Sequence, residues 1–207
     1  MQHLPLDNIF IPSKTPSKKI MIVLHGRGDS AEGFSKLPEF LDLDDMNYLL
    51  LDAPFEYFNG FSWYQLPPDQ LPGIAYSSKI LTQIFDTLFE TDFEASQSYL
   101  FGFSQGALLS FEFGARYAKK LAGYIAVSGY IYDTKKLIEE MNPDLLEASW
   151  WCSHGMDDRV LPFEQSALQV KQLQDQGWQI DFHAYDKEHT LDLDEIKDIK
   201  AWISSCG

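Results

Sequence analysis

The segment at residues 102–106, Gly-Phe-Ser-Gln-Gly, constrains the fold of this chain more than any other. It follows a run of strand-forming side chains and precedes an apolar run with helical character. A Gly-x-Ser-x-Gly turn between a strand and a helix is typical of a nucleophile elbow, which raises a strained serine above a sheet. Small residues are needed at Gly102 and Gly106, because a side chain there would crowd the strand or the helix. The sequence therefore predicts Ser104 as a nucleophile, with an ordinary glycine-flanked turn as the alternative.

The order of strands and helices around this turn predicts an α/β fold. Apolar runs typical of strands in a parallel sheet lie at 19–24, 48–51, 98–101, 121–127 and 149–153, with shorter or alternating strand patterns at 8–12 and 179–185. Helical patterns lie at 31–40, 74–90, 107–118, 163–173 and from 192 onward. We therefore expect a mostly parallel central sheet with helices on both faces and no large cap domain. Residues 1–207 are expected to form a single domain.

Residues 55–73 interrupt this alternation with six aromatic side chains in the first ten positions and three prolines later. A loop of this length is usually functional or disordered, and its aromatic content argues against disorder. We expect an irregular loop that forms an apolar wall for an acyl chain or an alcohol group. The wall would consist of Phe55, Phe58, Phe61, Trp63 and Tyr64. The alternative is that these aromatic rings only pack the loop onto the body of the protein.

Polar residues that follow the predicted strands are candidates for an acid and a base, because ligands of open α/β sheets bind outside the carboxyl ends of the strands. His189, between the last strand and the last helix, is the expected general base, and an exposed loop histidine is the alternative. Asp158 is the expected acid, since its place in the middle of a strand-to-helix loop lets it face His189. Asp157 is the alternative acid. The order Ser104, Asp158, His189 is that of α/β-hydrolases and differs from the two protease orders.

An oxyanion site requires two backbone N–H groups that point at the developing negative charge. Gln105 supplies one of them, because it follows Ser104 at the positive end of the predicted helix. Arg27, within His-Gly-Arg-Gly at 25–28, is well placed to supply the other, since flanking glycines allow a close approach to the ligand. A phosphate loop is the alternative for 25–28, and we set it aside because the segment lacks the Gly-Lys-Ser/Thr ending.

Composition and charge restrict the partners that this chain can have. Asp and Glu number 31 against 16 Lys and Arg, a net charge of −15, so we expect no nucleic-acid partner. No segment approaches the length of a membrane span, and we expect a cytoplasmic protein without stable membrane insertion. The two cysteines, Cys152 and Cys206, are expected to be free thiols. A small-molecule ester or acyl substrate fits this composition, and a homodimer is compatible with it.

Four segments resemble the phospholipase/carboxylesterase family of small serine hydrolases, which includes acyl-protein thioesterases, lysophospholipases and bacterial carboxylesterases. They are Leu-His-Gly-Arg-Gly-Asp at 24–29, Gly-Phe-Ser-Gln-Gly-Ala at 102–107, His-Gly-Met-Asp-Asp-Arg-Val-Leu-Pro at 154–162, and Glu-His at 188–189. The resemblance covers nearly the whole chain. It implies an α/β-hydrolase fold, Asp158 as the acid, and neither a metal nor an organic cofactor. Trp63 falls where relatives have a tryptophan close to the active site.

Two residues depart from the family pattern. Ala107 stands where the thioesterase branch usually has a second glycine, and Arg159 stands where proline is common. The resemblance therefore implies a serine carboxylesterase that hydrolyses short- to medium-chain esters through an acyl-enzyme. Phe61, Trp63 and Tyr64 are the expected substrate-binding residues. Alternatives are an acyl-protein thioesterase or lysophospholipase, a peptidase and, from another class, a non-catalytic hydrolase-fold binding protein.

Overall fold

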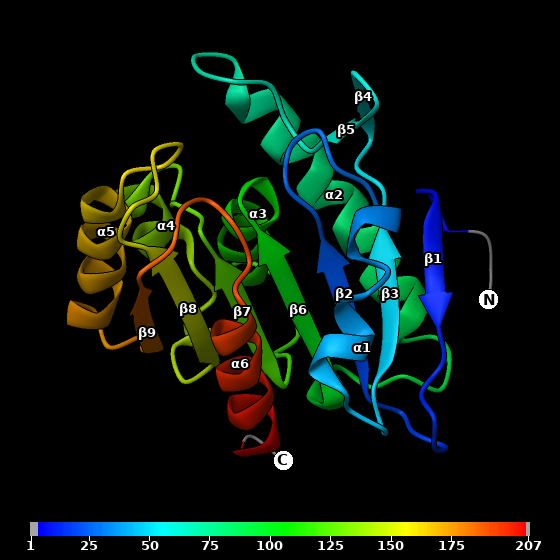
Figure 1. The fold of residues 1–207 in the computed structure, drawn as a ribbon. Helices are drawn as coiled ribbons and strands as arrows, with labels where there is room; N and C mark the ends of the chain where they lie inside the picture. Colours follow the sequence, from blue (N-terminus) through cyan, green and yellow to red (C-terminus); the bar gives the residue numbers. More distant parts are fainter. Residues whose placement is uncertain (1–3, 206–207) are drawn as a thin grey trace.

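A seven-stranded sheet runs through the molecule, with helices on both of its faces (Figure 1). The computed structural model describes residues 4–205, so Cys206 lies outside the described residues. The strands are β1 (Asn8–Ile11), β2 (Ile20–Leu24), β3 (Asn47–Leu51), β6 (Ser98–Phe103), β7 (Gly123–Val127), β8 (Ser149–Gly155) and β9 (Gln179–Tyr185). Their order across the sheet is β1-β3-β2-β6-β7-β8-β9. β1 pairs with β3 in the antiparallel sense and the other neighbouring pairs are parallel, which confirms the predicted sheet.

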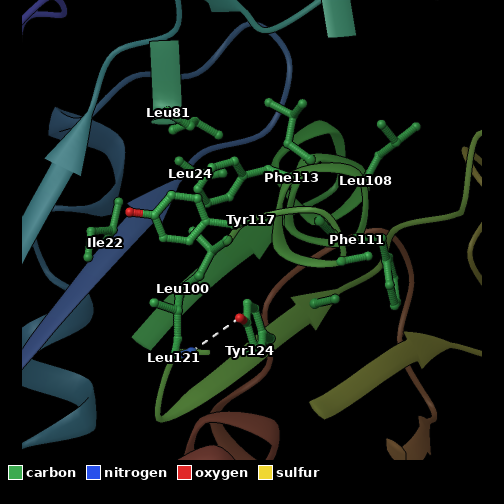
Figure 2. Packing of buried hydrophobic residues seen from close by; sticks show 14 of the residues in the cluster. Ile22, Leu24, Leu81, Leu100, Leu108, Phe111, Phe113, Tyr117, Leu121 and Tyr124 are labelled. Carbon is green, nitrogen blue, oxygen red and sulfur yellow. Dashed lines mark hydrogen bonds between the residues drawn. The ribbon is translucent and has the colours of Figure 1, made fainter. Parts of the chain in front are cut away.

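The helices are α1 (Leu37–Leu41), α2 (Gln70–Leu88), α3 (Gln105–Gly114), α4 (Thr134–Glu140), α5 (Phe163–Asp175) and α6 (Leu193–Ser205). Alternate residues of each strand contact different helices, because successive side chains of a strand point to opposite faces. Ile22 and Leu24 of β2 belong to the core on the side of α2 and α3, whereas Val23 belongs to the core on the side of α1 and α6. Figure 2 shows Ile22 and Leu24 within the first of these cores, near Leu81 of α2 and Phe113 of α3. Both faces of the sheet are therefore covered, which is why β2 and β7 are buried along their whole length.

Residues 55–73 differ from the irregular loop that the sequence predicts. β4 (Phe55–Tyr57) and β5 (Gly60–Ser62) form an antiparallel hairpin, and α2 begins at Gln70. The hairpin turn places Phe58 at a φ of 52°, the positive value that tight two-residue turns need. Gly60 permits close packing of the hairpin, because a Cβ there would collide with the carbonyl oxygen of Gly28. The hairpin and its aromatic residues therefore lie against the segment at 25–28. No large cap domain is present within the described residues.

The helix expected over residues 31–40 is broken. A 3-10 turn at Glu32–Phe34 is followed by the short helix α1. Pro38 lies in the first turn of α1, where its missing N–H group leaves no hydrogen bond unmade. A proline further inside a helix would remove a hydrogen bond and clash with the preceding turn, so the helix starts just before it.

Cys152 is in β8, the strand between β7 and β9. Its side chain is buried, and this burial raises the pKa of the thiol well above its ordinary value. The thiol is free, as the sequence predicts for this residue. Among residues 4–205, no helix is both long enough and apolar enough to cross a bilayer.

Candidate active site

Ser104 lies at the turn between β6 and α3 with φ 55° and ψ −110°, a strained conformation for any residue with a side chain. A Cβ added at Gly102 would collide with the carbonyl oxygen of Gly106, and one at Gly106 would collide with that of Leu24. Both glycines are therefore required by close backbone contacts. The Ser104 N–H donates to Val127 O at 2.9 Å, so the neighbouring strand β7 holds the strained residue in place. The turn has the shape of the nucleophile elbow that the sequence predicts.

A chain of hydrogen bonds joins Ser104, His189 and Asp158. His189 Nε2 lies 2.9 Å from Ser104 Oγ, and His189 Nδ1 lies 2.7 Å from Asp158 Oδ2. A carboxylate only accepts, so Nδ1 carries the proton and Nε2 is free to accept from the serine hydroxyl. The side chain of His189 is 16% exposed, whereas that of Asp158 is 0% exposed. The three residues have the mutual geometry in which imidazole can remove the serine proton.

The carboxylate of Asp158 is held by several donors. Its Oδ1 accepts from the backbone N–H groups of Val160 and Leu161, each at 2.8 Å. Burial alone would raise the pKa of Asp158, but the hydrogen bonds from Leu161, His189 and Val160 outweigh it and hold this pKa below its usual value. Asp157, the alternative acid, is exposed, and its N–H donates to Lys187 O at 3.2 Å. The structure therefore brings Asp158, not Asp157, to His189.

His154 is a further neighbour of the acid. Its Nε2 donates to Leu161 O at 2.8 Å and lies 3.2 Å from Asp158 Oδ2. The ring is buried, and this burial lowers the pKa of His154, so the neutral form is favoured at neutral pH. The neutral ring therefore holds Leu161, in the loop that carries Asp158, without adding a second positive charge beside the acid.

Lys187 is a buried neighbour of this site that the sequence analysis did not single out. Its buried ammonium donates to both carboxylate oxygens of Glu195, at 2.7 and 2.6 Å, and to Thr190 O at 2.7 Å. It also lies 3.3 Å from Ser128 Oγ. These contacts connect the loop that carries His189 to α6 and to the end of β7. Glu195 also accepts from the N–H of Asp192 at 3.2 Å, the contact of a capping box at the start of α6.

The segment at 25–28 lies beside the serine. A Cβ built on Gly26 would be 3.4 Å from Ser104 Cβ, which is ordinary van der Waals distance. The Gly28 N–H donates to Phe61 O at 2.7 Å, so the hairpin fixes the loop next to Arg27. Gln105 is the first residue of α3, and its N–H is one of the first four that have no acceptor within the helix. Both predicted oxyanion donors therefore belong to backbone segments that flank Ser104.

Two residues of the predicted aromatic wall, Trp63 and Tyr64, contact the segment at 25–28 and the start of α3. Trp63 and Tyr64 are 0% and 1% exposed, and Phe61 is half-buried. Trp63 Nε1 donates to His25 O, and the Trp63 N–H donates to Gln105 Oε1, each at 2.9 Å. Gln105 Nε2 donates in turn to Tyr64 O at 2.8 Å. Trp63 and Tyr64 therefore pack the loop onto the body of the protein, as the alternative interpretation expects, and their contact with substrate stays a prediction.

A cavity of about 380 Å³ opens beside the proposed base. Its lining is mostly apolar and includes His189, Phe103, Phe34, Phe40 and Leu191. Mostly apolar cavities with a few polar groups are typical of small-molecule sites. Within residues 4–205, no three His, Cys, Asp or Glu side chains are grouped so as to hold a metal ion.

Comparisons with known proteins indicate the family to which this chain belongs. The sequence model of the family described as Phospholipase/Carboxylesterase matches residues 7–207. Acyl-protein thioesterase 1 of Kluyveromyces lactis is 26% identical over 97% of this chain and 98% of its own length. Carboxylesterase SOBER1 of Arabidopsis thaliana is 26% identical over 90% of each chain.

Solved structures show the same fold. The crystal structure of esterase PE8 has a TM-score of 0.88 at 24% identity and covers 98% of this chain and 99% of its own. That of Arabidopsis thaliana SOBER1 has a TM-score of 0.84 at 25% identity, over 92% of this chain and 99% of its own. The predicted fold and enzyme class, a serine hydrolase, are confirmed. The elbow, the parallel sheet and the match over residues 7–207 together place this chain in the phospholipase/carboxylesterase family of α/β-hydrolases.

Proposed function

We propose that this protein is a serine carboxylesterase that hydrolyses esters of short- to medium-chain acids, with Ser104, His189 and Asp158 as nucleophile, base and acid. The observation that carries the proposal is the unbroken chain of hydrogen bonds from Ser104 Oγ through His189 to Asp158 Oδ2. A single α/β-hydrolase domain carries the activity, and the substrate is a small-molecule ester met in the cytoplasm.

In the acylation step, His189 Nε2 takes the Oγ proton as Ser104 attacks the ester carbonyl carbon. The negative oxygen of the tetrahedral intermediate accepts from the N–H groups of Arg27 and Gln105. Asp158 stabilises the imidazolium while the C–O bond breaks, and His189 returns its proton to the leaving alcohol. A water molecule then repeats the attack on the acyl-enzyme, with His189 again as base, and releases the acid.

The size of the substrate is inferred from the surroundings of His189. The cavity of about 380 Å³ beside His189 and Phe103 has room for a short or medium apolar group. Trp63 and Tyr64 are buried, so in this proposal they act on the substrate side by holding the wall of the site in place. Phe61 is the partly exposed member of the three predicted substrate-binding residues.

Replacing the nucleophile tests the proposal. Ser104→Ala should lower kcat for p-nitrophenyl butyrate by at least about 10³-fold, because it removes the hydroxyl group that His189 activates. Ser204→Ala, at an exposed position of α6, is the matched control and should retain full activity. The mutant should unfold at the temperature of the wild type and should no longer react with a fluorophosphonate probe. Hydrolysis that survives in a folded Ser104→Ala protein would refute the assignment, and a wild type that never reacts with the probe would favour a non-catalytic binding protein.

A thioesterase activity is the second candidate. Two yeast relatives favour it. Both are named acyl-protein thioesterase 1, and they match 97% and 96% of this chain. The same serine can attack a thioester, whose thiolate leaves without needing a proton from His189. A pair of butyryl compounds that differ only in an oxygen or a sulfur leaving atom separates the two activities. A kcat/KM for the thioester that exceeds that for the ester by 10-fold or more would favour the thioesterase.

A further inference from the structure

The cavity beside His189 lies on the face of the sheet that α1 and α6 cover (Figure 1). Its buried lining includes Leu37 of α1 and Ile196 of α6. Phe103, the residue before Ser104, also lines the cavity and packs against the same core. The cavity therefore begins next to the proposed nucleophile and is bounded by the two helices.

Aromatic rings lead from the proposed base into this cavity. The ring centroids of His189 and Phe103 are 5.1 Å apart, and those of Phe103 and Phe34 are 6.2 Å apart. His189 and Phe103 are both half-buried, so each has surface that a ligand can contact. Aromatic rings attract other rings in offset or edge-to-face contact. This wall therefore favours an apolar group that contains a ring.

Two exposed apolar side chains form the outer part of the lining. Phe40 is 51% exposed and Leu193 is 58% exposed. Large apolar side chains that are exposed together beside a cavity are available for burial by a ligand. The charged residues of the lining, Asp29 and Lys36, have opposite signs, so the cavity favours neither an anion nor a cation. The ligand that fits is neutral and apolar.

The geometry of the proposed reaction assigns this cavity to one part of the ester. The carbonyl oxygen faces the N–H groups of Arg27 and Gln105. The oxygen of the leaving alcohol lies within hydrogen-bond reach of His189 Nε2, because it takes the proton from that atom as its bond to the carbonyl carbon breaks. His189 lines the cavity, whereas neither Arg27 nor Gln105 does. The group on the alcohol oxygen is therefore the one that reaches the cavity.

We propose that this cavity is the leaving-group subsite and that it binds the apolar, ring-containing part of a neutral alcohol. Phe40 and Leu193 determine the specificity for this alcohol, because they are the apolar surface that the alcohol covers. This subsite rests on the proposed esterase activity of Ser104 and adds to it a preference for one side of the ester.

A comparison of acetate esters tests the proposal. Phenethyl acetate carries a ring on the alcohol, whereas methyl acetate has the same acid and no ring. The wild type should hydrolyse phenethyl acetate with a kcat/KM at least about 10-fold above that for methyl acetate, because burial of the ring lowers the free energy of the transition state. Equal values for the two acetates would overturn the leaving-group subsite.

Two altered proteins locate the subsite with a pair of reversed esters. Methyl hydrocinnamate has the same atoms as phenethyl acetate but carries the ring on the acid. Phe40→Ala and Leu193→Ala should each lower the ratio of kcat/KM for phenethyl acetate to that for methyl hydrocinnamate by about 5- to 10-fold. Both residues are exposed, so both variants should fold. Leu168→Ala, at a position of α5 that is 60% exposed and does not line the cavity, is the matched control and should keep the ratio.

Hydrolysis of p-nitrophenyl butyrate, measured on the same samples, keeps the two proposals apart. A ratio that is unchanged in both variants, or that rises, would overturn the subsite while the esterase activity stands. So would a wild type that hydrolyses p-nitrophenyl butyrate but not phenethyl acetate. If the wild type hydrolyses neither ester and does not react with a fluorophosphonate, the proposed function fails, and the subsite fails with it.

Discussion

Asp158 and Glu112 are both buried carboxylates, with side chains that are 0% and 8% exposed. Asp158 accepts from two backbone N–H groups and from His189, whereas Glu112 has Arg116 on one oxygen and nothing from the described residues on the other. Burial acts to raise both pKa values, yet the pKa of Asp158 is lowered and that of Glu112 is raised. The hydrogen bonds to Asp158 therefore outweigh its burial, whereas Arg116 alone does not outweigh the burial of Glu112.

The contributions of the two carboxylates to stability change in opposite ways as the pH rises. The pKa of Asp158 is lower in the folded than in the unfolded chain, so its contribution is present above its ordinary value of 3.8 and is lost as the pH falls through the folded pKa. The pKa of Glu112 is higher in the folded chain, so its contribution is present below its ordinary value of 4.5. It is lost as the pH rises through the raised folded pKa. Asp158 thus favours the folded state at neutral pH, and Glu112 opposes it.

Asp158→Asn should have the largest effect on activity, because it removes the carboxylate that accepts from His189. The amide can donate to His189 Nδ1 and would favour the wrong tautomer, so kcat for p-nitrophenyl butyrate should fall by about 10⁴-fold. Asp157→Asn is the matched control and should change kcat by less than about twofold, because Asp157 is exposed. Similar losses in the two variants would show that Asp158 has no special relation to His189.

Lys187→Met should have the next largest effect, because it leaves Glu195 buried without its cation. Removing one partner of a buried pair lowers the free energy of unfolding by about 3–5 kcal/mol. The loop that carries His189 then loses its anchor, and kcat should fall by about 10²-fold with little change in KM. Urea unfolding and steady-state kinetics below the melting transition measure the two effects.

The double variant Lys187→Met, Glu195→Leu separates charge from position. It removes both charges, so it should recover most of the lost stability. It should not recover kcat, because the contacts of Lys187 with Thr190 and Ser128 are still missing. A double variant with wild-type kcat would mean that Lys187 does not position His189.

Trp63→Phe and Trp178→Phe compare a partnered with an unpartnered indole. Trp63 Nε1 donates to His25 O, whereas Trp178 Nε1 is buried without a partner in the described residues. Trp63→Phe should lower the free energy of unfolding by about 1–3 kcal/mol more than Trp178→Phe, since it leaves a buried carbonyl unpaired. It should also reduce kcat, because His25 belongs to the segment that carries Arg27. Equal losses of stability in urea unfolding would remove the distinction between the two indoles.

Glu112→Gln should have the smallest effect on the free energy of unfolding. The dependence of this effect on pH tests the difference between Glu112 and Asp158. The wild type should lose stability relative to the variant as the pH rises from 4.5 toward neutrality, because the folded chain holds the proton of Glu112 more tightly than the unfolded chain does. Urea unfolding at a series of pH values gives this difference. Glu139→Gln is exposed and should show no such trend. A difference that is flat with pH would mean that Glu112 is ionised as readily in the folded chain as in the unfolded one.

The sequence predicted those parts of the site that depend on local pattern. Ser104, Asp158 and His189 each follow a strand of a parallel sheet, and the strands end at one edge because successive crossovers bring them back in the same direction. The two glycines of the elbow were also predictable, since the turn requires them whatever lies around it. Asp158 was separated from Asp157 by its place in the loop alone.

Long-range contacts could not be predicted from such patterns. A lysine two residues before His189 reads as exposed, and only the folded chain shows that Glu195 covers its charge. Trp63 finds its acceptor on His25, 38 residues earlier in the chain, so no local rule indicates that it braces a loop. The hairpin at 55–62 was missed because strands of three residues are too short to show an alternating pattern.

Cys152 gives this protein a built-in reporter of motion within its sheet. The thiol lies on β8 between β7 and β9, three residues before Gly155, and is shielded from solvent on both sides. An alkylating reagent can reach it only when this half of the sheet opens. In a chain that carries Cys206→Ser it is the remaining cysteine, so its alkylation rate measures how often the strands that carry Asp158 and His189 separate. Substrate analogues that stabilise the closed sheet would lower the alkylation rate of Cys152.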